Sequence, residues 1–392
     1  MITFQHVTKR YPDGTVAVDA LDLEVPAGKT MVLVGPSGCG KTTTLRMINR
    51  LVEPSEGKIL LDGQDVQQVN PAQLRRGIGY VIQQTGLFPH RTVEDNIATV
   101  PLLNGWRRAK ARARARDLLS LVGLDPALAR RYPHQLSGGQ QQRVGVARAL
   151  AADPPVLLMD EPFSAVDPLV RSALQDELVR LQTELRKTIV LVTHDIEEAI
   201  KVGDLVALYR PEGRLAQVDP PQQLLGAPAD SYVSDFVGFD RGIRRLSFFR
   251  AAGLNLRTEP VAGPDSTVAE ALDAARRSGE QWILVTGQDR KPRGWVPAGR
   301  LESLPGGTPL GGVPADGFGH TFTVDADSLR AALDAAVLSP AGHAVGVDGD
   351  GRVVGMLSYD ELRAAIQAAD GAATADGAGW EPAEPEPERA AP

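Results

Sequence analysis

The segment at residues 35–42, Gly-Pro-Ser-Gly-Cys-Gly-Lys-Thr, constrains the fold more than any other part of the chain. It fits the pattern G-x-x-x-x-G-K-[ST] and lies between an apolar run at 30–34 and a stretch with helical character. In that context, backbone N–H groups can turn inward around phosphate oxygens, and the positive end of the following helix adds to the attraction. The sequence therefore predicts a phosphate-binding loop inside an α/β domain.

Charged and hydroxyl side chains stand at the end of this loop. Lys41 supplies a compact positive charge for the outer phosphates of a nucleotide, and the Thr42 hydroxyl is placed to ligate Mg²⁺. Cys39 is interpreted as a small filler residue, with a redox switch as the alternative. The residues predicted to bind the nucleotide are Gly35, Pro36, Ser37, Gly38, Cys39, Gly40, Lys41, Thr42 and Thr43.

The first 240 residues or so alternate apolar runs with amphipathic helical patterns, which is typical of an α/β domain with a largely parallel sheet. The runs are apolar throughout, as expected when helices cover both faces of a sheet. We predict strands at 30–34, 78–82, 156–159, 188–193 and 205–209, and helices at 107–122 and 169–187.

A second acidic element stands at the end of the apolar run 156–159. Asp160 would end a strand, where a carboxylate can hold Mg²⁺ through its water shell, and Glu161 is positioned to polarise an attacking water molecule. An apolar strand that ends in Asp-Glu carries little information by itself. In a chain that also has the loop 35–42, it predicts a site that hydrolyses a nucleotide.

A third element, Leu-Ser-Gly-Gly-Gln at 136–140, ends 20 residues before Asp160. It is followed by Gln-Gln-Arg and resembles the signature sequence of the ATP-binding-cassette (ABC) family. The resemblance extends from residue 1 to about residue 238. It implies a P-loop NTPase fold of the α/β class, with a mixed sheet core and a helical subdomain, and it implies ATP and Mg²⁺ as ligands.

Other positions match functional elements of the ABC family. Tyr11 matches the aromatic residue that stacks on adenine, and Gln83 matches the glutamine of the Q-loop. The sequence Ser-Ala-Val-Asp at 164–167 matches the D-loop, with Val166 where leucine is commoner, and His194 matches the switch histidine. The resemblance implies that Glu161 acts as the general base, that His194 bridges the γ-phosphate and the water, that Gln83 assists them, and that Thr42, Gln83 and Asp160 hold the metal.

The resemblance also implies a composite site, because two ABC cassettes meet head to tail. Ser137, Gly139 and Gln140 of one chain would complete the nucleotide site built around Lys41 of a second copy. A serine hydroxyl, glycine N–H groups and a helix N-terminus together form a suitable cradle for a γ-phosphate.

Several longer segments indicate one subfamily of ABC proteins. Their sequences resemble those of the ATPase subunit of importers for quaternary-amine osmoprotectants: glycine betaine, carnitine, choline and sometimes proline. This implies membrane permease subunits as partners, an indirect link to a substrate-binding protein, and a location at the cytoplasmic face of the plasma membrane. Leu87, Phe88 and Pro89 are candidate contacts with the permease, with plain packing as the alternative. The segments are 35–50, 78–84, 86–90, 92–96 and 131–136.

Charge and hydropathy argue against other functions. The 42 Lys and Arg residues against 49 Asp and Glu residues give a net charge of −7, which disfavours a nucleic-acid partner. No apolar run reaches the roughly 18 residues needed to span a bilayer, and the single cysteine fits a reducing compartment.

Two alternatives to the function as an osmoprotectant importer ATPase stay open. The chain could be the ATPase of an importer for another small solute, or a soluble ABC ATPase that does not take part in transport.

An internal repeat follows residue 256 or so. The sequence Ala-Leu-Asp-Ala-Ala at 271–275 recurs at 332–336, an offset of 61 residues, and Gly294 falls on Gly355 at the same offset. Two copies are too few for a solenoid and indicate a paired module. The pair resembles a tandem CBS module of the α+β class, which this importer subfamily carries after the cassette.

The CBS resemblance leaves the regulatory ligand open. Nucleotide-binding CBS repeats usually show G-x-x-[ST]-x-x-D, but the second copy has Glu361 at the Asp position, and the first has Pro297 and Arg300 at the last two positions. These departures disfavour ordinary AMP or ATP. A regulatory cyclic dinucleotide bound between the modules and ionic-strength sensing stay as alternatives.

The basic run at 106–116 is interpreted as a solvated helix face, with contact to anionic lipid headgroups as the alternative. The predicted organisation is an ABC ATP-binding domain at 1–238, a linker at 239–256, CBS repeats at 257–305 and 315–369, and a disordered acidic tail at 370–392.

Overall fold

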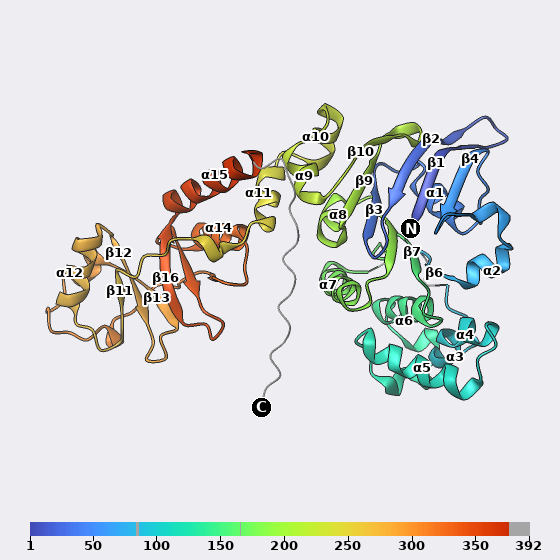
Figure 1. The fold of residues 1–392 in the computed structure, drawn as a ribbon. Helices are drawn as coiled ribbons and strands as arrows, with labels where there is room; N and C mark the ends of the chain where they lie inside the picture. Colours follow the sequence, from blue (N-terminus) through green and yellow to red (C-terminus); the bar gives the residue numbers. More distant parts are fainter. Residues whose placement is uncertain (84–85, 165, 376–392) are drawn as a thin grey trace. The chain divides into compact units, whose positions relative to one another are not determined.

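The computed structural model describes residues 1–83, 86–164 and 166–375, and its contacts divide the chain into two compact units (Figure 1). The first unit is Met1–Phe239, and the second begins at Asp240. Each unit has buried hydrophobic clusters of its own. None of the described helices is both long and apolar enough to cross a membrane.

A six-stranded sheet in the order β10-β9-β3-β8-β7-β6 forms the centre of the first unit. Its neighbours pair in parallel, except that β10 is antiparallel to β9. Strands β3, β7 and β8 are buried at every position, which explains their uninterrupted apolar sequences and confirms the predicted strands to within one residue. The bounds are β3 (Thr30–Val34), β6 (Ile78–Val81), β7 (Val156–Asp160), β8 (Thr188–Val192), β9 (Leu205–Tyr209) and β10 (Leu215–Asp219).

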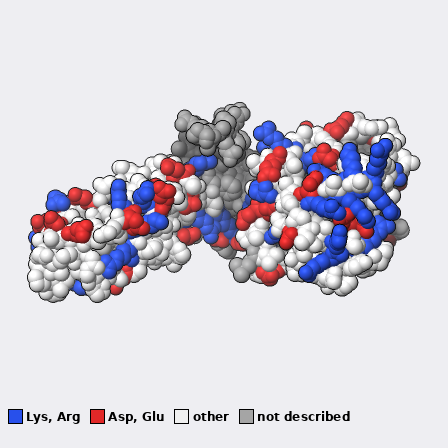
Figure 2. Space-filling model, turned by 90° about the horizontal axis from the view of Figure 1, so that it is seen from below, with Lys and Arg blue, Asp and Glu red and all other residues white. Residues whose placement is uncertain are grey.

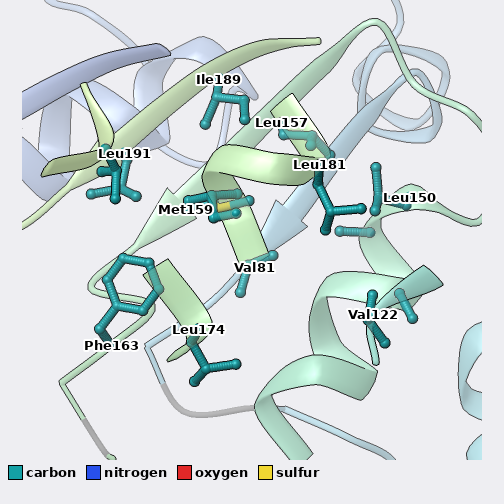
Figure 3. Packing of buried hydrophobic residues seen from close by; sticks show 14 of the residues in the cluster. Val81, Val122, Leu150, Leu157, Met159, Phe163, Leu174, Leu181, Ile189 and Leu191 are labelled. Carbon is teal, nitrogen blue, oxygen red and sulfur yellow. The ribbon is translucent and has the colours of Figure 1, made fainter. Parts of the chain in front are cut away.

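Successive side chains of the central strands point to opposite faces of this sheet, and each face has its own core. Val32 and Val34 belong to a cluster that includes residues of helices α6 (Gly138–Leu150) and α7 (Pro168–Leu185), and Figure 3 shows part of this packing. The alternate residues Met31 and Leu33 belong to the opposite cluster, with side chains of α1 (Lys41–Ile48). The sheet is therefore held between two layers.

A second sheet, in the order β2-β1-β4-β5, completes this opposite layer and was not among the predicted strands. It is antiparallel throughout. In β2 the C-terminal half alternates between buried and exposed side chains, because only one face of this sheet is covered. The bounds are β1 (Ile2–Arg10), β2 (Val16–Val25), β4 (Glu56–Leu61) and β5 (Gln64–Asp65).

A helical subdomain is inserted between β6 and β7. Its helix α5 (Arg108–Leu121) buries Ala111, Ala115 and Leu118, whose spacing places them on one helix face. Helix α5 corresponds to the predicted helix 107–122, and α7 to the predicted helix 169–187. The remaining helices of the first unit are α2 (Pro71–Arg76), α3 (Val93–Ile97), α4 (Thr99–Leu103), α8 (Ile196–Val202), α9 (Pro221–Gly226) and α10 (Ser231–Val237).

Figure 2 shows that Lys and Arg side chains gather on one face of the first unit. On α5, part of this charge is balanced locally: Arg112 pairs with Glu94 at 3.1 Å and with Asp95 at 3.0 Å, and Arg116 pairs with Glu94 at 3.0 Å. These pairs support the interpretation of the basic run as a helix face whose charges are solvated or paired.

The second unit contains two copies of one arrangement. The first copy has the sheet β11-β12-β13 and the second has β14-β15-β16; in both, the first pair is parallel and the second pair antiparallel. The offset of 61 residues also relates the strand registers, because Trp282 pairs with Pro297 and His343 pairs with Ser358. The bounds are β11 (Val261–Ala262), α12 (Val268–Ser278), β12 (Trp282–Thr286), β13 (Pro292–Pro297) and α13 (Ala298–Leu301), then β14 (Thr321–Thr323), α14 (Leu329–Leu338), β15 (His343–Val347), β16 (Val353–Ser358) and α15 (Tyr359–Ala375).

The predicted linker at 239–256 and the beginning of the predicted acidic tail both contribute to the second unit. The segment 239–256 contains α11 (Arg241–Arg245), and its Leu246 and Ala251 are buried in the core of the second repeat. The first six residues of the expected acidic tail, 370–375, instead belong to helix α15. Residues 376–392 of that tail lie outside the described residues.

Candidate active site

The phosphate-binding loop connects β3 to α1, as its sequence predicts. Two glycines are needed for its path. A Cβ atom on Gly35 would lie 2.7 Å from the Tyr209 carbonyl oxygen, and one on Gly40, whose φ is 93°, would lie 2.0 Å from the Ala17 carbonyl oxygen. Any larger residue would therefore displace the loop from the neighbouring strands.

Lys41 is buried, and its ammonium group folds back against the loop. The Nζ atom donates hydrogen bonds of 2.8 Å to the carbonyl oxygens of Gly35 and Pro36. It also lies 3.5 Å from the sulfur of Cys39, a buried residue whose burial raises the pKa of its thiol. The burial of Cys39 supports its interpretation as a small filler. The loop thus holds a positive charge at its centre, where phosphate oxygens would be attracted.

Thr42 and Asp160 meet between α1 and β7. The Thr42 hydroxyl donates a hydrogen bond of 2.9 Å to Oδ1 of Asp160, and Arg46 lies 3.5 Å from Oδ2 of the same carboxylate. Sequence reasoning missed Arg46, although its position four residues after Thr42 places both on one face of α1. The carboxylate is almost fully buried, and the Tyr80 hydroxyl interacts with it as well, so its orientation is determined by these contacts together.

The donor set at this point fits Mg²⁺. A hydroxyl oxygen and a carboxylate oxygen converge, and Mg²⁺ prefers oxygen ligands. Among the described residues, no group of three or more His, Cys, Asp or Glu side chains is arranged to hold a metal ion. This is expected for Mg²⁺ in a nucleotide site, since the ion takes one or two protein oxygens and completes its shell with phosphate and water.

Three predicted catalytic residues come together at the ends of neighbouring strands. Gln83, Glu161 and His194 follow β6, β7 and β8, and the carboxyl ends of adjacent parallel strands meet at one edge of a sheet. Nε2 of Gln83 donates a 3.0 Å hydrogen bond to Oε2 of Glu161, and Nδ1 of His194 lies 3.4 Å from Oε1. Glu161 is therefore held between an amide and an imidazole.

The backbone of Glu161 is strained. Its φ is 45°, in the left-handed region that non-glycine residues rarely adopt. Its N–H group donates a 3.0 Å hydrogen bond to the carbonyl oxygen of Val192, which ties the loop after β7 to the end of β8. Such strain costs roughly 1–3 kcal/mol and is typical of functional sites.

Tyr11, which the family resemblance predicts to stack on adenine, lies beside the start of α1. Its hydroxyl is 3.5 Å from the Thr43 hydroxyl, and its ring is partly exposed. The Lys9 ammonium lies 5.2 Å from the ring centroid. The exposed ring is thus available for stacking next to the phosphate-binding loop.

The predicted signature residues do not lie at the strand ends that carry the residues described above. They form the beginning of helix α6, in the helical subdomain. The Ser137 hydroxyl accepts a hydrogen bond from the Gln140 N–H at 3.3 Å, and Oε1 of Gln140 accepts one from the Ser137 N–H at 3.0 Å. Gly138 and Gly139 form the first turn between them. This capping box leaves Ser137 exposed, so the N-terminus of α6 is accessible from outside the chain.

Comparison with known proteins identifies the family. The family model described as ABC transporter matches residues 18–164. The chain is 43% identical over 371 residues to the osmoprotectant import ATP-binding protein OsmV of Salmonella typhimurium, across 92% of this chain and 95% of that protein. The chain belongs to the ABC transporter family. The matched segment contains the loop 35–42, Gln83, Ser137 and Glu161, so the ABC assignment and the site geometry concern the same residues.

Other ABC proteins extend the comparison. The chain is 46% identical over 297 residues to the glycine betaine/carnitine/choline transport ATP-binding protein OpuCA of Bacillus subtilis, across 76% of this chain and 78% of that protein. It also matches the ATP-binding cassette MJ0796, solved as a dimer in a post-hydrolysis state with ADP and Pi, at 34% identity and a TM-score of 0.52. That match covers 56% of this chain and 99% of the solved one. These comparisons confirm the predicted family and the P-loop α/β fold.

Proposed function

We propose that this chain hydrolyses ATP to energise the import of quaternary-amine osmoprotectants, such as glycine betaine, carnitine and choline, through a membrane permease. The observation that carries the ATPase part is the meeting of Gln83 and His194 on the carboxylate of Glu161, beside the Thr42–Asp160 pair. The names of the relatives support the osmoprotectant part. The solute itself would be selected by the permease and a substrate-binding protein.

In the proposed ATP hydrolysis reaction, the phosphate-binding loop, Glu161 and His194 each have a separate role. The phosphates of ATP bind to the loop 35–42 and attract the Lys41 ammonium away from the carbonyl oxygens that it contacts here. Glu161 accepts a proton from the attacking water, whose oxygen forms a bond to the γ-phosphorus as the bond to the bridging oxygen breaks. Nδ1 of His194 lies against Glu161, and Nε2 on the other side of the ring would contact the γ-phosphate.

Mg²⁺ would be held by Thr42, Gln83 and Asp160 and would neutralise charge on the phosphates. Arg46 keeps the Asp160 carboxylate turned toward Thr42. Tyr11 would stack on the adenine. Together these groups fix ATP at its base, its phosphates and its metal.

Two copies of the chain would complete each site. The exposed Ser137 and the N-terminus of α6 are suited to a γ-phosphate bound by the other copy, because backbone N–H groups and the helix dipole attract anions. The chain contains one phosphate-binding loop and one such signature, which supports a head-to-tail pair. The dimeric state of the solved cassette supports the proposal that two copies associate.

A cleft on the first unit is the proposed docking surface for the permease. It has a volume of about 270 Å³ and lies between β6, α4 and α6. Phe88 lines it and is exposed, with the Arg91 guanidinium 4.9 Å from its ring centroid. Leu87 instead packs against the core, so Phe88 and the exposed Pro89 are the better candidates among the three residues predicted to contact the permease.

The second unit is proposed as a tandem CBS module that regulates the ATPase. The matching strand registers of its two copies support this assignment. The carboxylate of Glu361 already accepts hydrogen bonds from the Ser358 N–H at 2.7 Å and from Arg257 at 3.0 Å. These contacts support the expectation that this repeat does not bind AMP or ATP in the ordinary way.

Uptake of radiolabelled solutes tests the proposed function. Cells that contain the permease and either the wild-type chain or Lys41→Ala would be given glycine betaine, carnitine or choline at low and high external salt. We expect uptake of at least one solute with the wild type and none with Lys41→Ala. Uptake that does not depend on Lys41 would contradict the osmoprotectant assignment.

A further inference from the structure

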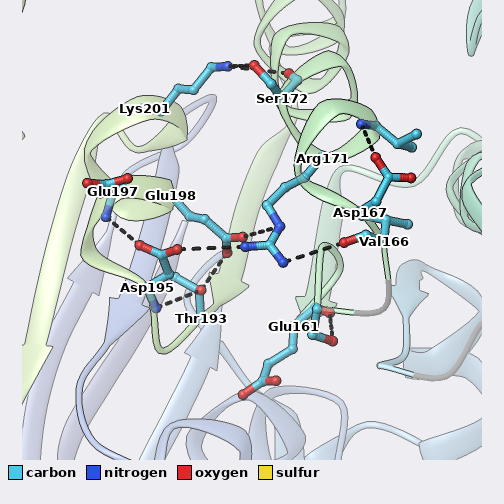
Figure 4. A network of polar contacts seen from close by, with 12 residues as sticks. Glu161, Val166, Asp167, Arg171, Ser172, Thr193, Asp195, Glu197, Glu198 and Lys201 are labelled. Atoms are coloured by element: carbon cyan, nitrogen blue, oxygen red, sulfur yellow. Dashed lines mark hydrogen bonds and ion pairs between the residues drawn. The ribbon is translucent and has the colours of Figure 1, made fainter.

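A polar network lies beside the strand ends that carry Glu161 and His194 (Figure 4). Glu198, on α8, is a buried carboxyl in this network, and burial raises its pKa. Oε2 accepts a 2.6 Å hydrogen bond from the Thr193 hydroxyl, and Oε1 faces Arg171 of α7 at 3.7 Å. A buried carboxylate needs such partners, because transfer from water is costly for a charged group.

Arg171 serves three acceptors that come from different segments. Besides Glu198, its Nη1 lies 3.9 Å from Oδ2 of Asp195, the residue after His194. Its Nη2 donates a 3.5 Å hydrogen bond to the carbonyl oxygen of Val166, in the segment 164–167 that resembles a D-loop. One planar guanidinium thus connects the loop after β7 with the loop after β8.

Both loops are also linked directly to the catalytic pair. The Ser164 hydroxyl donates a 3.0 Å hydrogen bond to the carbonyl oxygen of Glu161, so the start of the segment 164–167 folds back on the catalytic residue. Asp195 follows His194 and caps α8 through the Glu197 N–H at 2.8 Å. The contacts of Arg171 therefore reach the immediate neighbours of Glu161 and His194.

We propose that Arg171 is a positioning residue for ATP hydrolysis: it keeps Val166, in the loop after β7, and the turn 193–195 in register, so that Glu161 and His194 face the same water and phosphate. The inference rests on the proposed function and extends it to a residue outside the nucleotide contacts. A misalignment of about 1 Å between reacting groups is enough to cost a large factor in rate.

Lys201 provides a matched control. Like Arg171, it connects α8 to α7: its ammonium donates to the Ser172 carbonyl and hydroxyl oxygens at 3.3 and 3.0 Å, and it pairs with Asp176 at 2.7 Å. None of these partners belongs to the two catalytic loops. A purely structural bridge between the helices would therefore be weakened similarly by Lys201→Met and by Arg171→Met.

The test compares steady-state ATP hydrolysis and thermal unfolding of the full-length chain. Arg171→Met keeps the apolar stem and removes the guanidinium; we expect kcat to fall about tenfold or more while KM for ATP changes by less than about threefold. Lys201→Met should leave kcat within about twofold. An unchanged kcat in Arg171→Met, or an equal loss in both variants, would overturn the proposal.

A double variant separates positioning from stability. In Arg171→Met the carboxylate of Glu198 stays buried without its cationic partner, and the additional change Glu198→Gln removes that charge. We expect Arg171→Met/Glu198→Gln to regain thermal stability without regaining kcat, because the Val166 carbonyl is still unbound. Recovery of kcat together with stability would assign Arg171 a structural role only and would overturn the proposal.

The outcome for Arg171 is distinguishable from that for the proposed function. The assay measures ATP hydrolysis and not uptake, so a failed uptake experiment overturns the osmoprotectant assignment alone. A wild-type chain without ATPase activity would overturn the proposed function itself. An active wild type with a fully active Arg171→Met would overturn only the positioning role.

Discussion

The hydroxyl of Thr42 donates a 2.9 Å hydrogen bond to the carboxylate of Asp160, although the two residues are 118 positions apart in the chain. The bond joins the first turn of α1 to the end of β7, and it brings together the two protein oxygens suited to Mg²⁺. Because Asp160 is almost fully buried, its carboxylate cannot turn to solvent instead. The Mg²⁺ dependence that we propose for ATP hydrolysis should therefore depend strongly on this residue.

We expect Asp160→Asn to raise the Mg²⁺ concentration for half-maximal ATP hydrolysis by about tenfold or more, because the amide is a weaker ligand for a hard cation. A titration of ATPase activity with MgCl₂ measures this shift. Asp153→Asn, at an exposed position near the same strand, is the control and should keep the wild-type curve. A wild-type curve for Asp160→Asn would exclude this carboxylate as a ligand.

Gly40→Ala should lower the free energy of unfolding more than Gly63→Ala does. The new Cβ would lie 2.0 Å from the Ala17 carbonyl oxygen, whereas Gly63, with a similar positive φ of 79°, has open space around it. Both changes incur the left-handed backbone cost, but only Gly40→Ala adds an overlap. We expect its free energy of unfolding to fall by about 2 kcal/mol more than that of Gly63→Ala, measured by urea denaturation. Equal losses would contradict the close packing.

Glu198 should make the stability of the protein depend on pH. Because burial raises its pKa in the folded state, the folded protein keeps this proton to a higher pH than the unfolded chain does. At pH values between the pKa of Glu198 in the unfolded chain and its higher pKa in the folded protein, the folded state binds more protons. The free energy of unfolding therefore falls as pH rises from the lower pKa to the higher one. The Glu198→Gln variant has no proton to lose there.

The stability of Glu198→Gln relative to the wild type should therefore improve as pH rises from about 4 toward 7. Urea denaturation at a series of pH values measures the difference. Glu56→Gln, at an exposed position on β4, is the control. A difference that stays constant across this range would mean that Glu198 has the same pKa in both states.

Phe88→Ser should separate ATP hydrolysis from transport. If the cleft at Phe88 receives the permease, loss of the ring removes an exposed aromatic anchor without affecting the nucleotide site. We expect uptake to fall about tenfold or more while the ATPase rate of the isolated chain stays within about twofold. Leu51→Ser, which removes another exposed apolar side chain, should preserve both. Normal uptake with Phe88→Ser would exclude this residue from the interface.

The sequence predicted the central sheet well because its strands are fully buried. Strands β3, β7 and β8 have uninterrupted apolar sequences, and Gln83, Glu161 and His194 lie just beyond the ends of such runs. The end of the run 156–159 was enough to predict Glu161. Gln83 and His194 were predicted from the resemblance to the ABC family, which also supplied the roles of all three residues. They meet because the ends of adjacent parallel strands lie at one edge of the sheet.

The antiparallel sheet was missed for a physical reason. Strands β1 and β2 are half exposed, and irregularities interrupt their alternation at His6 and Ala20, which both have positive φ. Arg171 was missed for another reason: Glu198 is brought to it by the packing of α8 against α7, and its hydrogen bond to the Val166 carbonyl depends on the path of the loop before α7, which no sequence pattern signals.

Glu161→Gln tests the central claim most directly, because the substitution preserves the shape of the side chain and removes the carboxylate that we propose as the general base. We expect ATP to bind with an affinity within about threefold of wild type and to favour the dimer, while hydrolysis falls by about 10²–10⁴-fold. Nucleotide binding, size-exclusion chromatography with ATP and phosphate release measure the three quantities. A near-normal rate of phosphate release from Glu161→Gln would contradict the assignment of this carboxylate as the base.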